Sequence, residues 1–179
     1  MKMTSILRRQ AMKKTSILAK TRLFAFLDLD QLKEVVELAE EKRFGKDETI
    51  FSQGEQAKTL YLLLEGGVVL KRMGIEDLDP MAETLDQKGD VFGMAALSKS
   101  HIYNVTAKTT GETRVLSLDS ERLRAIVRQN PHTGMEVFSE LAQLYLNRLN
   151  SARAAISNMF AVSRAQHTSP VYGLYQELE

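Results

Sequence analysis

The spacing of apolar residues divides the chain into a short helical segment, a region of short strands and two later helices. Residues 28–41 have helical spacing at Leu29, Leu32, Val35, Val36 and Leu38. From residue 42 to 118, short apolar runs broken by glycine predict strands near 41–45, 49–52, 59–65, 67–73, 82–86, 102–109 and 113–118, with a loop over 74–80. This order predicts an α+β protein built on a β-barrel or jelly roll with flanking helices.

The last two helices have clear signals. Asp119 or Ser120 can cap a helix over 121–129, and Pro131 marks its end. A longer helix over about 133–160 has a heptad pattern at Phe138, Ala142, Tyr145, Leu149, Ala152, Ile156 and Met159. An amphipathic helix can pack this face on its own barrel or on a partner. Leu141 and Leu144 could supply the packing against the barrel, so the heptad predicts a dimer interface.

Charge is distributed unevenly along the chain. The net charge is +1, yet residues 1–22 hold seven Lys and Arg and no acid, so the remaining chain is acidic. This basic arm has an internal repeat, because Thr4-Ser5-Ile6-Leu7 recurs 11 residues later as Thr15-Ser16-Ile17-Leu18. Eleven residues make about three helical turns, which would place the repeated residues on one face. The arm is interpreted either as a docking helix for an acidic partner or membrane surface, or as a duplicated tail without that role.

Composition argues against several classes of function. The chain has no cysteine, so disulfides, thiolate metal sites and thiol catalysis are excluded. Its three histidines, His101, His132 and His167, lack metal-ligand spacing, and no catalytic triad or carboxylate pair stands out. No apolar run approaches the roughly 20 residues that span a bilayer, and no signal peptide is apparent. We therefore expect a cytoplasmic protein that is not an enzyme and has no metal or cofactor.

Four motifs occur in an order typical of one family. They are Leu23-Phe24-Ala25-Phe26-Leu27, then Thr49-Ile50-Phe51-Ser52-Gln53-Gly54-Glu55, then the strand pair 60–70 around Gly66-Gly67, and last Gly89-Asp90-Val91-Phe92-Gly93-Met94-Ala95-Ala96-Leu97 followed by 101–107. The last motif resembles the phosphate-binding cassette of cyclic nucleotide-binding domains, whose pattern is G-D-x-F-G-E-x-A-L, a loop and R-[ST]-A. The resemblance covers roughly residues 18–158. This part of the chain is similar to the sensor module of bacterial catabolite activator proteins.

The resemblance implies a ligand site whose key side chains differ here. In the family the glutamate accepts the ribose hydroxyl and the arginine neutralises the cyclic phosphate. Met94 stands at the glutamate position, and His101-Ile102 at the arginine–threonine pair. Lys99 could supply a positive charge in the loop between them, and His101 could do so below its pKa. The candidate degenerate pocket comprises Phe92, Gly93, Met94, Ala95, Ala96, Leu97, Lys99, His101, Ile102 and Tyr103.

The predicted organisation is a basic arm over 1–17, a cyclic nucleotide-binding-like domain over 18–132, a dimerisation helix over 133–160 and a tail over 161–179. The residues after 160 are too few for the helix-turn-helix domain of bacterial activators, so we expect no sequence-specific DNA binding. The predicted function is that of a non-catalytic bacterial regulatory or scaffold protein. We expect it to act as a homodimer or with an unidentified protein partner. We also expect that it does not bind cyclic AMP or cyclic GMP in the usual way. The alternative is a sensor that uses the altered pocket for another nucleotide or metabolite.

Overall fold

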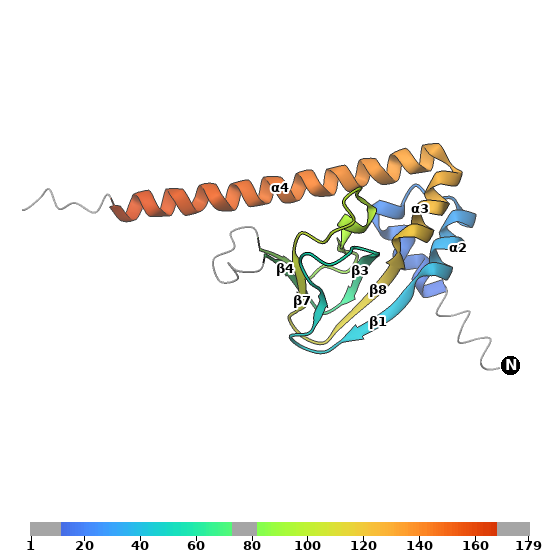
Figure 1. Ribbon diagram of the computed structural model, residues 1–179, viewed down its shortest axis with the longest axis horizontal. Helices are drawn as coiled ribbons and strands as arrows, with labels where there is room; N and C mark the ends of the chain where they lie inside the picture. The colour runs from blue at the N-terminus through green and yellow to red at the C-terminus, as the bar shows by residue number, and fades with distance from the viewer. Residues whose placement is uncertain (1–11, 73–81, 168–179) are drawn as a thin grey trace, which may run out of the picture.

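The computed structural model describes residues 12–72 and 82–167, which form a strand body with helices on one side (Figure 1). The predicted loop over 74–80, the first copy of the basic repeat and the last part of the predicted tail lie outside the described residues. The element α4 extends beyond the body as a long helix (Figure 1).

Within the described residues, eight antiparallel strands form two sheets of four. One sheet has the order β1-β8-β3-β6, from β1 (Glu40–Phe44), β8 (Thr113–Asp119), β3 (Thr59–Glu65) and β6 (Val91–Phe92). The other has the order β2-β7-β4-β5, from β2 (Thr49–Phe51), β7 (Thr106–Thr109), β4 (Val68–Lys71) and β5 (Glu83–Leu85). Together with the flanking helices, this arrangement confirms the predicted α+β class.

The continuous apolar run of β3 separates two cores. Leu60, Leu62 and Leu64 pack with the helices, whereas Tyr61 and Leu63 pack with the strands of the second sheet. Successive side chains of a strand point to opposite faces, so a strand covered on both faces is apolar throughout. This strand therefore joins the helical layer to the interior between the sheets.

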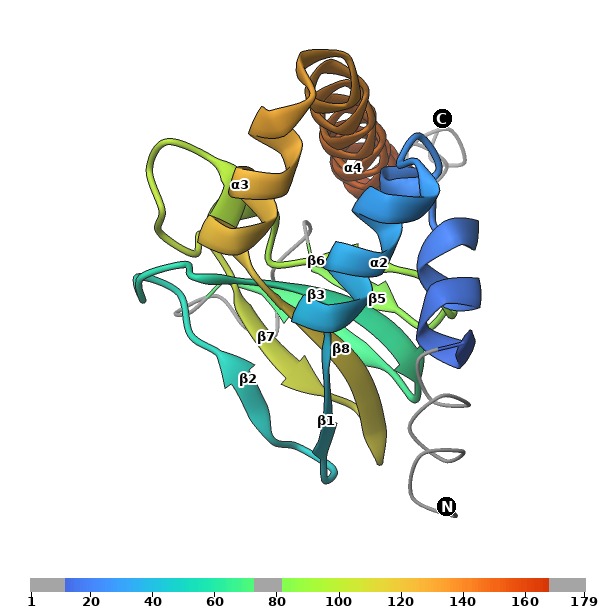
Figure 2. The same ribbon diagram turned by 90° about the vertical axis from the view of Figure 1, so that its right-hand side faces the viewer.

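The helices cover the outer face of the first sheet (Figure 2). Asp28 begins α2 (Leu29–Leu38) with a capping box, in which its side chain accepts from the Gln31 backbone and Gln31 accepts in return. Asp119, one of the two caps that the sequence allowed, caps α3 (Ser120–Gln129) by accepting from the backbone N–H of Arg122. A short 3-10 helix, η1 (Arg22–Phe24), buries Leu23 and Phe24.

Several boundaries differ from those expected. Helix α4 spans Pro131–His167, so seven residues assigned to the tail continue the helix; no proline or glycine interrupts residues 161–167, which allows the helix to continue. The first helical segment ends at Leu38, because Glu40 already pairs with Ser117 in the sheet. The strand expected from 102 begins only at Thr106.

The described part of the basic arm is helical. Residues 12–20 form a helix that runs across position 17, where the sequence had suggested the end of the arm. Leu18 is fully buried in the helical core, and Ile17 packs against that core. Lys14 donates to the carbonyl of Ala39. The second copy of the repeat therefore packs on the body of the same chain.

Candidate ligand pocket

A single glycine sets the course of the cassette loop, which we define as residues 89–105. Gly93 has a φ of 74°, in the left-handed region. A Cβ atom there would lie 2.8 Å from the carbonyl oxygen of Thr59 and 3.5 Å from the ring of Tyr103. Glycine is thus required at this turn, which leads into the 3-10 helix η2 (Met94–Leu97), whose four side chains are all buried.

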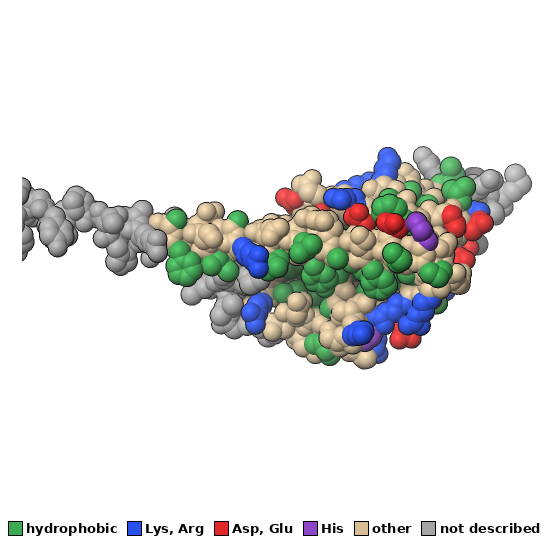
Figure 3. Space-filling view, turned by 90° about the horizontal axis from the view of Figure 1, so that it is seen from above, with side chains coloured by type: hydrophobic (Ala, Val, Ile, Leu, Met, Phe, Trp, Pro, Cys, Tyr) green, Lys and Arg blue, Asp and Glu red, His purple; other side chains and the backbone are tan. Residues whose placement is uncertain are grey.

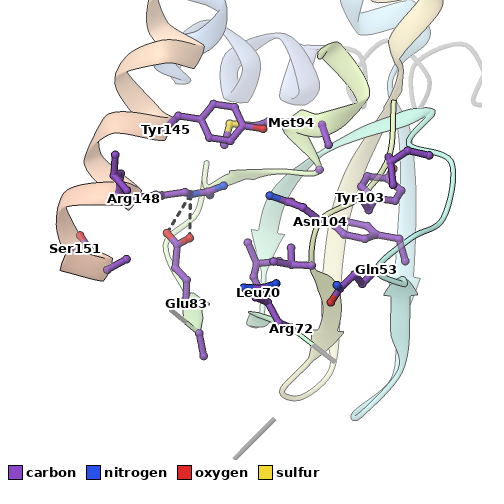
Figure 4. A pocket seen from close by; sticks show the side chains of 18 of the residues that line it. Gln53, Leu70, Arg72, Glu83, Met94, Tyr103, Asn104, Tyr145, Arg148 and Ser151 are labelled. Carbon is purple, nitrogen blue, oxygen red and sulfur yellow. Dashed lines mark hydrogen bonds and ion pairs between the residues drawn. The ribbon is translucent and has the colours of Figure 1, made fainter. Parts of the chain in front are cut away.

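The inner side of the cassette loop faces a cavity of about 700 Å³ between the strands and α4 (Figure 4). Most of its lining is apolar, and α4 supplies one wall. The lining residues are Phe51, Gln53, Gly54, Leu70, Arg72, Ala82, Glu83, Gly93, Met94, Ala95, Ile102, Tyr103, Asn104, Val105, Tyr145, Arg148, Leu149, Ser151, Ala152 and Ala155. This volume lies within the range of small-molecule sites.

Stacked aromatic rings form one side of the cavity. The rings of Phe51 and Tyr103 lie 3.8 Å apart between centroids and within 14° of parallel, and Tyr61 stacks on Phe92 behind them. The Tyr103 hydroxyl donates to the Thr59 carbonyl at 2.8 Å and accepts from the Thr59 N–H at 3.3 Å. Burial raises the pKa of Tyr103 well above its usual range, so this side of the cavity is uncharged.

An ion pair joins α4 to the barrel at the cavity wall (Figure 4). The guanidinium of Arg148 lies 2.9 Å from Glu83 in β5, and it also donates to the carbonyl of Val91 at 2.7 Å. The partly buried arginine is thereby held by two strands. Its charge is balanced by Glu83, so the pair adds no net charge to the wall.

The structure separates the predicted pocket residues into three groups. Gly93, Met94, Ala95, Ile102 and Tyr103 line the large cavity. Phe92 and Ala96 are fully buried in the core between the sheets. The remaining three, Leu97, Lys99 and His101, line a separate hollow of about 210 Å³ on the outer side of the loop.

His101 faces the outer hollow because its backbone has a positive φ of 49°. Its ring accepts a hydrogen bond from Arg124 of α3 at 3.0 Å. Arg124 also donates to the carbonyls of Ala96 and Ser98, at 2.7 and 3.1 Å. Arg128 lines the same hollow. The basic side chains of the cassette loop itself, Lys99 and His101, therefore lie outside the large cavity.

Sequence reasoning missed several polar residues of the cavity. Arg148 and Ser151 come from α4, Glu83 from β5 and Asn104 from the end of the loop. One signal was available: Arg148 is next to the heptad residue Leu149 on an otherwise apolar flank of the helix. Its partner Glu83 carries no comparable signal.

The heptad residues of α4 present an apolar stripe, which is visible along one flank of the helix (Figure 3). Phe138, Tyr145, Leu149 and Met159 are between 41% and 54% exposed. Ala142 is exposed too, whereas Ala152 and Ile156 are half-buried. Leu141 is buried against the body and Leu144 packs beside it, as predicted. Tyr145, Leu149 and Ala152 also line the large cavity, so the stripe and the cavity share a wall.

Neither a metal centre nor a membrane span is found in the parts of the chain that the structure describes. Residues 12–72 and 82–167 contain no group of three His, Cys, Asp or Glu side chains placed to hold a metal ion. Within the same ranges, no helix is both long and apolar enough to cross a bilayer.

Comparison with known proteins defines the class of this protein. The family model of the cyclic nucleotide-binding domain matches residues 41–130. The transcriptional regulator LdrP of Thermus thermophilus is 32% identical over 139 residues, covering 75% of this chain and 70% of LdrP. This chain therefore belongs to the cyclic nucleotide-binding domain family.

Two further relatives show how far the similarity extends. A crystal structure of a protein described as cyclic nucleotide-binding, from Geobacter metallireducens, is 32% identical with a TM-score of 0.65; the match covers 75% of this chain and 97% of that one. The cAMP-activated global transcriptional regulator CRP of Pasteurella multocida is 26% identical, over 65% of this chain and 54% of CRP. This chain spans between 29% and 70% of the lengths of its curated relatives.

Proposed function

We propose that this chain is a non-catalytic regulatory module that acts through protein–protein contacts of α4. The observation that carries the proposal is the apolar stripe of that helix. An exposed apolar stripe of this length is typical of a surface that binds another protein. The names of LdrP and CRP, both transcriptional regulators, support a regulatory role.

The partner that best fits the stripe is a second copy of the same helix. Spacings of four and three residues at Phe138, Ala142, Tyr145 and Leu149 continue through Ala152, Ile156 and Met159. This repeat aligns the same face of two helices over several turns. Leu149 lies at the middle of the stripe and is 41% exposed in the single chain. Pairing would bury it.

Sedimentation of two matched variants tests the dimer. Leu149→Asp places a charge in the proposed interface, where burial without a partner is costly. Asn150→Asp places the same charge on the next residue of α4, outside the stripe. We expect Leu149→Asp to sediment as a folded monomer at tens of micromolar, and wild type and Asn150→Asp as dimers. A monomeric wild type, or a dimeric Leu149→Asp, would rule out this interface.

The module is also proposed not to bind cyclic AMP or cyclic GMP in the usual way. Met94 in the cavity cannot accept a hydrogen bond from ribose as a glutamate does, and His101 faces the outer hollow. Hydrogen bonds to charged groups contribute about 1.5–3 kcal/mol each, so losing two would cost about 3–6 kcal/mol. That cost corresponds to an affinity roughly a hundredfold to ten-thousandfold weaker.

A second candidate function is that of a small-molecule sensor, and the cavity itself favours it. A volume of about 700 Å³ is open to a ligand even though the residues that bind a cyclic nucleotide have changed. A thermal-shift panel of nucleotides and uncharged metabolites separates the two candidates. Stabilisation by one compound at micromolar concentration supports the sensor, whereas no shift across the panel supports a module that acts by protein contact alone.

A further inference from the structure

The chemistry of the large cavity defines the class of molecule that it would accept. We propose that the cavity binds a neutral, largely apolar organic molecule with one or two hydrogen-bonding groups, instead of an anionic nucleotide. This inference rests on the second candidate function, the sensor. It does not depend on the dimer.

The walls of the cavity are mostly apolar. Met94 fills the glutamate position with a thioether, and Ile102 and Tyr103 follow it on the loop side. Leu149 and Ala155 face them from α4. Apolar walls favour a ligand that can leave water without losing hydrogen bonds, and each charged group brought between them is costly.

Both arginines of the cavity wall already have interactions within the protein. Arg148 is paired with Glu83 at 2.9 Å and bonded to the Val91 carbonyl. Arg72 likewise has an interaction of its own. An anionic ligand would have to displace the Glu83 carboxylate or approach it, and like charges repel. A neutral ligand leaves the pair intact.

Several uncharged polar groups also line the cavity. Asn104 extends into the cavity from the strand side, opposite Tyr145 on α4 (Figure 4). Ser151 lies further along the helix. An amide and hydroxyls can orient a carbonyl or hydroxyl group of a ligand, as a few polar groups commonly do in apolar sites. The stacked Phe51 and Tyr103 rings offer a flat side for a planar molecule.

A matched pair of fluorescent probes tests the charge preference directly. N-phenyl-1-naphthylamine is neutral, and 8-anilinonaphthalene-1-sulfonate has the same rings with an added sulfonate. We expect wild type to bind the neutral probe at one saturable site at least about tenfold more tightly than the sulfonate. Equal or tighter binding of the sulfonate would overturn the inference.

Variants locate the probe and identify the cause of the preference. Ile102→Asp, on the loop side of the cavity, should weaken the neutral probe by about tenfold or more, whereas Leu29→Asp, at an exposed apolar position on α2, should leave it unchanged. Glu83→Gln removes the partner of Arg148 and should tighten the sulfonate selectively. Unchanged binding to Ile102→Asp would place the probe elsewhere and refute the site. If circular dichroism shows that Ile102→Asp is unfolded, Ala155→Glu on the α4 wall replaces it with the same expected loss.

Competition distinguishes this inference from the proposed function. If cyclic AMP displaces the neutral probe at low micromolar concentration, the proposal that cyclic nucleotides are not bound fails, and so does the ligand class. If cyclic AMP does not compete and the sulfonate binds as well as the neutral probe, only the ligand class fails. Sedimentation of Ile102→Asp as a dimer would show that the loss of probe binding is independent of the α4 contact.

Discussion

The inner and outer sides of the cassette loop differ in chemistry although they are formed by the same short stretch of chain. The inner side presents Met94, Ile102 and Tyr103 to the large cavity. The outer side presents Lys99 and His101 to a hollow that Arg124 also lines. The positive φ of His101 turns it to the outer side. One short stretch of chain thus presents different chemistry on its two sides: the glycine turn and η2 lead from one to the other, while Lys99 and His101 lie on the side away from the cavity.

The largest effect is expected on the outer side. Arg124→Met keeps the aliphatic stem but removes the donors to the Ala96 and Ser98 carbonyls. Leaving partly buried carbonyls without this donor should lower the free energy of unfolding by about 2 kcal/mol. Arg128→Met, at an exposed position on the same helix, is the control and should change it by less than about 0.5 kcal/mol. Urea unfolding at one fixed protein concentration measures both.

If the two arginine variants are equally stable, Arg124 does not hold the loop. The basic side chains around the outer hollow would then be a feature of the surface alone. The outer side of the loop would then have no structural role, although the inner side would still line an apolar cavity.

A smaller effect is expected on the inner side. Tyr103→Phe keeps the stacking on Phe51 and removes the hydroxyl that bonds the Thr59 backbone. We expect a loss of about 1 kcal/mol at pH 7 by urea unfolding. A loss below about 0.3 kcal/mol would show that the stacking alone fixes the ring.

Tyr103→Phe should also alter how the stability of the protein depends on pH in the alkaline range. Burial raises the pKa of Tyr103 in the folded protein, so the unfolded chain releases this proton first as pH rises past about 10. The contribution of Tyr103 to the free energy of unfolding is therefore complete below that pH and declines above it. Urea midpoints between pH 8 and 10.5 should fall more steeply for wild type than for Tyr103→Phe; parallel curves would contradict the assignment.

The smallest effect is expected from restoring the family side chains. The double variant Met94→Glu with His101→Arg returns the glutamate and arginine of the cassette pattern. Because position 101 faces the outer hollow and Tyr103 occupies the inner side, cyclic AMP affinity should rise by less than about tenfold. A return to low micromolar affinity would show that the pocket lacks only these two side chains and that its shape still fits the nucleotide.

The fold was predictable because its signals are local. Asp119 caps α3, and glycines separate the strands. The apolar run at 60–64 indicates a strand covered on both faces. The full length of α4 could not be predicted, because residues 161–167 have neither a helix breaker nor a strong apolar period. Among the residues singled out from the cassette motif, Met94, Ile102 and Tyr103 line the cavity. The direction of His101 depends on one backbone angle, and the Arg148–Glu83 pair joins residues 65 apart in sequence.

Isothermal titration of the wild-type protein with cyclic AMP tests the central claim most directly, because the claim is that the family pocket has lost its nucleotide chemistry. With Met94 at the glutamate position and no arginine from the cassette loop in the cavity, we predict no one-site binding tighter than about 100 μM. Cyclic GMP should give the same result. A one-site isotherm with a low-micromolar dissociation constant for either nucleotide would contradict the account.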